Sequence, residues 1–115
     1  LRKGIDLSQL GYYYSENKIY QGLGWEMYDY PVNEELVIRN SSNDVALMAK
    51  EIQAVKPEHM DGRQLLIHKT GATNGFGAYV AFIHSEKIGI VMLANKNFPN
   101  VQRVKAAFAI LNVLH

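Results

Sequence analysis

Residues 65–94 read LLIHKTGATNGFGAYVAFIHSEKIGIVMLA, and this stretch decides the fold of the 115-residue chain. Branched apolar residues predict a first strand over Leu65–Thr70. The almost unbroken apolar and small residues of Phe76–Ile83 and Ile88–Ala94 predict two more strands, each covered on both faces. Only short polar segments separate the three strands, so the stretch predicts an antiparallel meander.

Polar residues separate these strands and precede a helix. A first turn is predicted at Thr73-Asn74-Gly75, because Asn-Gly tolerates positive φ, and a second at residues 84–87. After Pro99, Asn100 is a candidate N-cap for a C-terminal helix. Apolar residues then recur at i, i+3, i+7 and i+10 and give this helix one face for the sheet: Val101, Val104, Phe108 and Leu111.

The N-terminal half carries weaker signals. A loose apolar stripe predicts a helix over Ile5–Tyr14, and the aromatic, glycine-interrupted segment Ile19–Asp29 predicts a strand or extended segment. Residues 31–44 predict a surface loop with one helical turn at Glu34–Ile38, and Val45–Val55 predicts a short strand. One strong and one weak helix cannot cover both faces of a buried sheet, so we expect more protein to belong here.

The composition is that of a globular protein. Hydrophobic residues make up 48% of the chain and charged residues 20%, and a net charge of +1 does not point to nucleic acid or an anionic membrane. No apolar run approaches the roughly 18 residues of a membrane span. The absence of cysteine excludes disulfides, zinc thiolates and a cysteine nucleophile, and the four histidines are scattered, so no metal site is expected. A start at Leu1 without Met favours a piece cut from a longer protein.

The first predicted strand ends in Lys69-Thr70-Gly71-Ala72, which carries the candidate chemistry. Lys69 places an ammonium beside the hydroxyl of Thr70. Gly71 has no side chain, so a ligand can lie flat against the backbone. The next residue, Ala72, offers its N–H and C=O groups to a ligand docked edge-on, as in strand addition. Such a wall suits a substrate with an amide and a carboxylate.

Three strings carry a resemblance to a known family, in the same order and spacing: YQGLGWEM at 20–27, HKTGATNGFGAYVAFI at 68–83 and GIVMLANKNFPN at 89–100. They resemble, nearly residue for residue, the C-terminal part of class C β-lactamases, the serine cephalosporinases of Gram-negative bacteria. The resemblance covers essentially the whole chain. It implies an α/β (α+β) fold of the β-lactamase and penicillin-binding type, in which an antiparallel sheet is flanked by helices. Residues 1–115 are then expected to be the C-terminal portion of one catalytic domain, with its last strands and C-terminal helix.

The resemblance also implies a mechanism without metal or cofactor. A serine in a Ser-X-X-Lys motif attacks the β-lactam carbonyl, a Tyr-X-Asn motif aids proton transfer, and water releases the acyl-enzyme. The residue matching Lys69 supports the tyrosine and the substrate carboxylate, and that matching Thr70 hydrogen-bonds near the carboxylate. The backbone matching Ala72 gives an oxyanion-hole N–H and receives the substrate's side-chain amide. Residues near the carboxylate end match three of this chain: Asn97, Asn100 and Arg103.

The chain departs from the family pattern in several places. Asn74 replaces a usual glycine and His84 a usual proline, both away from the site. The serine nucleophile and the tyrosine motif, which precede this region in the family, are absent. One string, Ser15-Glu16-Asn17-Lys18, does fit Ser-X-X-Lys, but glycines follow at once, whereas the chemistry needs the serine at the start of a buried helix. We therefore interpret this string as an exposed connection.

The hypothesis is that a longer protein carrying this chain hydrolyses β-lactams, especially cephalosporins, as a periplasmic monomer, and that the chain alone is inactive. A D,D-peptidase or esterase of the same fold is the first alternative. The second is a non-catalytic fragment that self-associates or binds a partner.

Two further features are interpreted from the sequence. The loop around Ser41, Asn43 and Leu47 matches one that, by the resemblance, borders the leaving-group side of cephalosporins. His68 is interpreted as a structural histidine.

Overall fold

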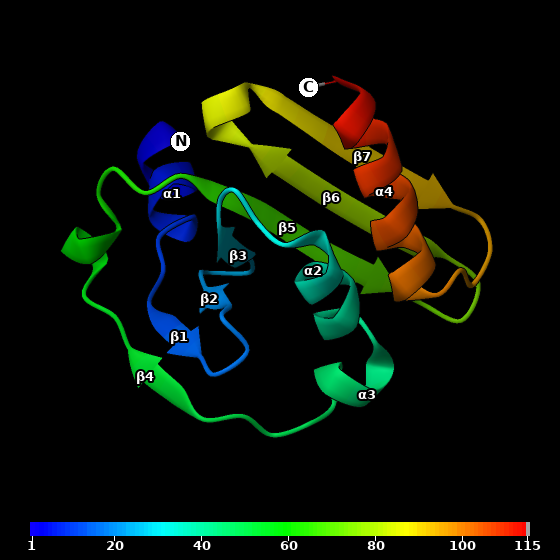
Figure 1. The fold of residues 1–115 in the computed structure, drawn as a ribbon, viewed down its shortest axis with the longest axis horizontal. Helices are drawn as coiled ribbons and strands as arrows, with labels where there is room; N and C mark the ends of the chain where they lie inside the picture. The colour runs from blue at the N-terminus through cyan, green and yellow to red at the C-terminus, as the bar shows by residue number, and fades with distance from the viewer. Residues whose placement is uncertain (115) are drawn as a thin grey trace.

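The computed structural model describes residues 1–114, which form a seven-stranded sheet with helices packed on it (Figure 1). The strand order is β4-β1-β2-β3-β5-β6-β7, and each neighbouring pair is antiparallel. The antiparallel sheet with helices that the sequence predicts is confirmed. In chain order the elements are α1 (Arg2–Ser8), β1 (Tyr13–Ser15), β2 (Tyr20–Gln21), β3 (Glu26–Asp29), α2 (Glu34–Asn40), α3 (Asn43–Ala46), β4 (Ile52–Ala54), η1 (Pro57–Met60), β5 (Leu65–Ala72), β6 (Gly77–Ile83), η2 (His84–Glu86), β7 (Ile88–Ala94) and α4 (Asn100–Leu114).

The predicted meander is confirmed, because β5, β6 and β7 pair in order. The expected positive φ at Asn74 or Gly75 is wrong. Within residues 1–114, the positive φ angles are those of Lys18, Gly24, Gly62 and Lys87. Because Ala72 pairs with Gly77, four residues form the connecting loop, and a loop of that length needs no two-residue turn with left-handed residues at its centre.

Helix α4 covers one face of the meander, as its apolar spacing predicts (Figure 1). Val101 is half-buried, and the fully buried residues of the helix are Arg103, Val104, Ala107, Phe108 and Leu111. The N-cap prediction is wrong by one residue. Asn100 is the first helical residue, and the carbonyl of Pro99 accepts the N–H groups of Gln102 and Arg103 at 3.0 and 3.1 Å. The Asn100 side chain is instead engaged by the guanidinium of Arg103.

The helix predicted over Ile5–Tyr14 is wrong in its second half, because α1 ends at Ser8 and strand β1 follows. The backbone of Tyr12 donates to the carbonyl of Gln21 and accepts the N–H of Val55, both at 2.9 Å. Both partners, Gln21 and Val55, are too far away in the sequence for the local spacing of apolar residues to reveal them. Strand pairing with distant segments therefore overrides the helical spacing of the apolar residues.

The segment 31–44 is more ordered than the loop predicted for it. Helix α2 extends to Asn40 and buries Val37 in the core that α4 also lines. Asn33 caps this helix by accepting the N–H of Leu36 at 3.3 Å. The short strand expected further on is confirmed as β4, an edge strand paired with β1.

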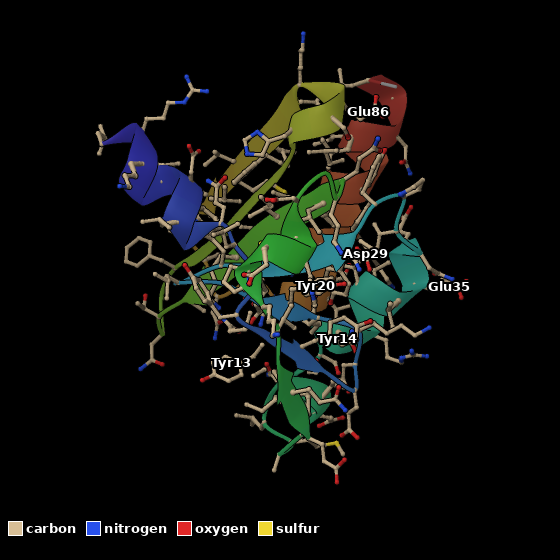
Figure 2. The ribbon with its side chains drawn as sticks, turned by 90° about the vertical axis from the view of Figure 1, so that its left-hand side faces the viewer. Tyr13, Tyr14, Tyr20, Asp29, Glu35 and Glu86 are labelled. Atoms are coloured by element: carbon tan, nitrogen blue, oxygen red, sulfur yellow. The ribbon has the colours of Figure 1, made fainter. Side chains whose placement is uncertain are left out.

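Strands β1 to β3 extend the sheet with aromatic side chains (Figure 2). The rings of Tyr14 and Tyr20 lie 4.5 Å apart, and the hydroxyl of Tyr20 donates to Asp29 at 3.1 Å. Burial raises the pKa of Tyr20, and the neighbouring Asp29 carboxylate adds to this effect. Tyr20 is buried and Tyr14 half-buried, whereas Tyr13 is exposed.

The two faces of the meander are covered unequally. Under α4 and α2 the core includes Leu66, Tyr79 and Ile83. On the opposite face a smaller cluster around Ile67 covers the half of β5 that pairs with β3. Within residues 1–114 the second face of β7 is uncovered, because Val91 and Leu93 are 66% and 82% exposed, so the two-sided cover expected for this strand is not supplied by this chain. Among the helices of residues 1–114, none is both long and apolar enough to cross a membrane.

Candidate active site

The wall segment, Lys69–Ala72, lies where β5 continues past the end of its neighbour β3. Successive residues of a strand direct their backbone groups to opposite sides. The carbonyl of Gln64, just before β5, accepts the N–H of Tyr30 at 2.9 Å on the β3 side. The even-numbered residues of β5 therefore direct their N–H and C=O groups toward β3. Strand β3 begins at Glu26, opposite His68. Within residues 1–114 no strand pairs with the wall segment on this side, so the N–H and C=O groups of Ala72 face an open edge. This is the edge-on geometry that the sequence predicts.

The side chains of the wall segment divide between the two faces of the sheet. Thr70 pairs with Tyr79 and lies on the α4 face. Lys69 is half-exposed, and its ammonium lies 3.7 Å from the carboxylate of Glu26. Gly71 faces away from α4, where an added Cβ would meet only the Cβ of Ala78, at 4.0 Å. The surface beside Gly71 is therefore flat enough for a ligand to lie along the backbone.

Glu26 links Lys69 to a buried histidine. His68 is 2% exposed, and its Nδ1 lies 2.9 Å from the hydroxyl of Tyr79. Its Nε2 faces Glu26 at 3.5 Å, which is a long contact rather than a hydrogen bond. Because a carboxylate can only accept a hydrogen bond, a neutral His68 ring carries its proton on Nε2, which faces Glu26. Its Nδ1 then accepts the hydroxyl proton of Tyr79. His68 therefore packs and hydrogen-bonds within the sheet, as the structural interpretation predicts.

The charges around Glu26 stabilise its ionised form. The contact with His68 lowers the pKa of the Glu26 carboxyl, burial opposes this, and Lys69 lowers the pKa further. Burial raises the pKa of the Tyr79 hydroxyl, so this group stays protonated. Sequence reasoning assigned Glu26 no role, because only the β3–β5 register brings it beside Lys69.

Arg103 is buried beneath the wall segment and donates to backbone and side-chain oxygens. Its Nη1 lies 2.6 Å from both the Gly71 and the Ala78 carbonyl oxygens, and its Nε lies 2.8 Å from that of Phe98. Its Nη2 donates to the side chain of Asn100. Burial lowers the pKa of Arg103. Within residues 1–114 no carboxylate lies within ion-pair distance of it, so its positive charge has no direct counter-charge.

The remaining predicted site residues lie close to this end of the meander. Asn97 is exposed in the loop between β7 and α4, and Asn100 is half-buried at the start of α4. The wall segment also borders a largely apolar hollow of about 510 Å³. Phe76 and Leu93 line it from the neighbouring strands and their loop. The hollow is large enough for a small molecule or for side chains of a covering segment.

Residues 15–18 have the Ser-X-X-Lys spacing but not the structure that the chemistry needs, which is a serine at the start of a helix. Ser15 is the last residue of β1, and Lys18 has a φ of 65° in the turn that follows. The Ser15 hydroxyl accepts the N–H of Ile19 at 3.4 Å. The interpretation of this string as a connection between strands is confirmed.

The loop predicted to border the leaving-group side contains α3. Ser41 is buried and donates to the carbonyl of Val37 at 2.7 Å, while Leu47 is exposed. Asn43 is the first residue of α3. Over residues 1–114 no three histidine, aspartate or glutamate side chains gather where they could hold a metal ion.

Comparison with known proteins identifies the class to which this fold and wall belong. A sequence model of the β-lactamase family matches residues 4–115. The chain is 53% identical to the β-lactamase of Escherichia coli K12 and 52% identical to that of Yersinia enterocolitica, over 99% of its own length. The chain belongs to the β-lactamase family. It spans about 30% of the length of these curated relatives.

Solved structures refine this assignment. A class C β-lactamase from Rhodobacter sphaeroides superposes with a TM-score of 0.89 at 33% identity, over 99% of this chain and 32% of that one. A β-lactamase/D-alanine carboxypeptidase from Pseudomonas syringae gives 0.83 at 34% identity, over 96% and 31%. The chain therefore has the fold of the C-terminal part of a class C β-lactamase.

Proposed function

We propose that a longer protein carrying this chain is a serine β-lactamase that hydrolyses cephalosporins through an acyl-enzyme. The observation that carries the proposal is the open edge at Ala72, three residues after the half-exposed Lys69 on the same strand. An amide-bearing β-lactam can pair with such an edge as an added strand does. Membership of the β-lactamase family supports the reaction class.

The wall residues divide the work of binding and polarisation. The N–H of Ala72 donates to the oxygen that becomes negative when the lactam carbonyl is attacked, and losing such a donor costs about 10²–10³ in rate. Lys69 contributes positive charge near the attacking hydroxyl and the substrate carboxylate, and Thr70 hydrogen-bonds near that carboxylate. Gly71 leaves the surface flat. Asn97, Asn100 and the charge of Arg103 act at the anionic end.

The nucleophile belongs to the part of the protein outside this chain. The sequence contains no Tyr-X-Asn, and its single Ser-X-X-Lys string lies in the β1–β2 connection. We therefore infer that residues 1–115 alone are inactive, and that the N-terminal part present in the relatives brings the serine to the open edge. The proposed protein is a periplasmic monomer whose reaction uses no metal or cofactor.

A D,D-peptidase is a second candidate, because one similar structure is described as a β-lactamase/D-alanine carboxypeptidase. The full-length protein, meaning this chain joined to that N-terminal part, distinguishes the two. We expect rapid multiple turnover of a chromogenic cephalosporin and slow release of D-alanine from a D-alanyl-D-alanine peptide. Fast acylation without turnover of the cephalosporin would support the peptidase and contradict the β-lactamase.

The isolated chain provides a second test. We expect residues 1–115 alone to leave the cephalosporin intact and to regain activity when mixed with the separately produced N-terminal part. Enzymatic rates from the chain alone, abolished by Ser15→Ala, would place the nucleophile in the β1–β2 connection. A chain that stays inactive but forms stable oligomers, with no gain from its N-terminal part, would support the non-catalytic fragment.

A further inference from the structure

We infer that Arg103 is a positioning residue for the Ala72 N–H, acting through the carbonyl oxygen of Gly71. The inference rests on the proposed function, in which that N–H stabilises the oxyanion. Arg103 Nη1 lies 2.6 Å from the Gly71 oxygen. This oxygen and the Ala72 N–H belong to one peptide unit, so a donor at one end of the unit acts on the other end.

The two ends of this peptide unit face opposite sides of β5. Odd-numbered residues of the strand direct their backbone groups toward β6, so the Gly71 oxygen points inward, while the Ala72 N–H points to the open edge. A hydrogen bond accepted by the oxygen draws electron density from the nitrogen. The N–H then becomes a stronger donor, as in other chains of polarised hydrogen bonds.

Arg103 is held rigidly enough to fix the direction of this peptide. Its planar guanidinium has five N–H donors, and four acceptors engage it: the carbonyls of Gly71, Ala78 and Phe98 and the side chain of Asn100. These contacts join the end of β5, the start of β6 and the start of α4. The side chain is only 2% exposed, so water does not compete for these bonds.

Gly77 provides the space that Arg103 occupies. A Cβ added at Gly77 would lie 3.2 Å from both Cζ and Nε of the guanidinium and 3.4 Å from its Cδ. The guanidinium therefore lies directly against the β6 backbone, and an added methyl group would displace it. Gly75, in the same hairpin, has open space at the corresponding position.

The geometry distinguishes this role from direct binding of a substrate carboxylate. A carboxylate clamp presents a free pair of parallel N–H donors to the ligand. Here Nε, Nη1 and Nη2 each donate to a carbonyl or amide oxygen, so no two nitrogens are free to present parallel donors to a ligand. The guanidinium contacts the oxygen end of the peptide unit, and the oxyanion contacts its N–H end. Arg103 therefore strengthens binding of the oxyanion whether or not the ligand carries a carboxylate.

The test measures acylation by a chromogenic cephalosporin and binding of phenylboronic acid in the full-length protein. The boronic acid carries no carboxylate and forms a negatively charged tetrahedral adduct with a serine. For Arg103→Met we expect both the acylation rate and the phenylboronic acid affinity to fall about 5- to 30-fold. This is part of the 10²–10³-fold cost of losing a donor, because the N–H remains but is less polarised and less fixed.

Two further variants separate positioning from folding. Arg103→Lys keeps the charge without the fork and is expected to recover part of both losses. Gly77→Ala keeps Arg103 but displaces it, and is expected to reproduce the Arg103→Met losses with little change in Tm. Gly75→Ala is the matched control and is expected to behave as wild type. The acyl-enzyme carbonyl stretch should shift to higher frequency in Arg103→Met and Gly77→Ala but not in Gly75→Ala.

The outcomes distinguish this inference from the proposed function. An active wild type whose Arg103→Met variant binds phenylboronic acid normally, while losing affinity for carboxylate-bearing ligands, would overturn the positioning role alone. Equal losses in Gly77→Ala and Gly75→Ala, or losses that follow Tm without a carbonyl shift, would also overturn it. A wild type that neither turns over the cephalosporin nor binds the boronic acid would overturn the proposed function and this inference together.

Discussion

The two halves of β5 show how one strand serves two purposes. Leu65–His68 lies between β3 and β6 and contributes buried side chains to the core. Lys69–Ala72 continues the same strand, with β6 on one side and an open edge on the other. The backbone groups that hold the sheet together in the first half are available to a ligand in the second. The difference arises because β3 begins at Glu26, opposite His68, and so leaves the second half of β5 without a partner on that side. It does not arise from any change within β5.

The largest expected effect comes from moving the same substitution along the strand. Leu66 and Ala72 both direct their N–H groups toward the β3 side, but only Leu66 has a strand partner on that side, Tyr28. Leu66→Pro removes a ladder hydrogen bond and a buried side chain, so we expect the full-length protein to lose more than about 3 kcal/mol of unfolding free energy. Urea unfolding measures this loss. A similar loss of stability in Ala72→Pro would contradict the contrast between the two halves.

Ala72→Pro is expected to affect catalysis rather than stability. It removes only the N–H that faces the open edge, so we predict a loss of about 10²–10³ in kcat with Tm nearly unchanged. Steady-state kinetics with a chromogenic cephalosporin checks the first part and thermal unfolding the second. Near-normal kcat in the variant would show that this N–H does not stabilise the oxyanion.

Lys69→Ala tests the charge at the open edge. We expect kcat/KM to fall about 10²-fold, because the ammonium supports both the attacking group and the substrate carboxylate in the proposed site. Lys105, which is exposed on α4, provides a matched control, and Lys105→Ala is expected to change kcat/KM less than about twofold. Equal effects from the two variants would point to a general loss of positive charge.

Glu26→Gln addresses the junction between the two halves through its pH dependence. Because the folded protein lowers the pKa of Glu26 below its ordinary value of 4.5, the carboxylate stabilises the fold above pH 4.5. This stabilisation is lost as the pH falls through the folded-state pKa. Wild type should thus exceed Glu26→Gln in unfolding free energy near neutral pH, by about 1 kcal/mol or less, and the difference should vanish in acid. A difference that is constant with pH would contradict this assignment.

In residues 1–115 alone, the smallest expected effect concerns the exposed face of the meander. Leu93 is 82% exposed, so Leu93→Ala in residues 1–115 should change stability by less than about 0.5 kcal/mol. In the full-length protein we expect a cost above about 1 kcal/mol, because we expect the N-terminal part to cover this face of the sheet. Urea unfolding of both forms gives the comparison. Equal small effects in both would mean that this face stays open.

Sequence reasoning succeeded where the signal is local. The apolar runs of β6 and β7 and the spacing of Val104, Phe108 and Leu111 each depend on residues that are close in the chain. It failed at residues 12–14, where pairing with β2 and with the β4 segment replaces the expected helix. It also underestimated α2, whose burial of Val37 depends on α4, more than 60 residues later.

The candidate site follows the same division. The sequence by itself determined the Lys69–Ala72 wall, the meander that carries it and the helix beneath it, because short-range patterns encode all three. Only the tertiary structure decided that β3 leaves Ala72 at an open edge, that Glu26 meets Lys69 and that Arg103 donates to Gly71. These contacts join residues 32 to 43 positions apart, or depend on where a neighbouring strand begins. The physical reason is that strand register and helix docking set their distances, and no local spacing of residue types specifies either.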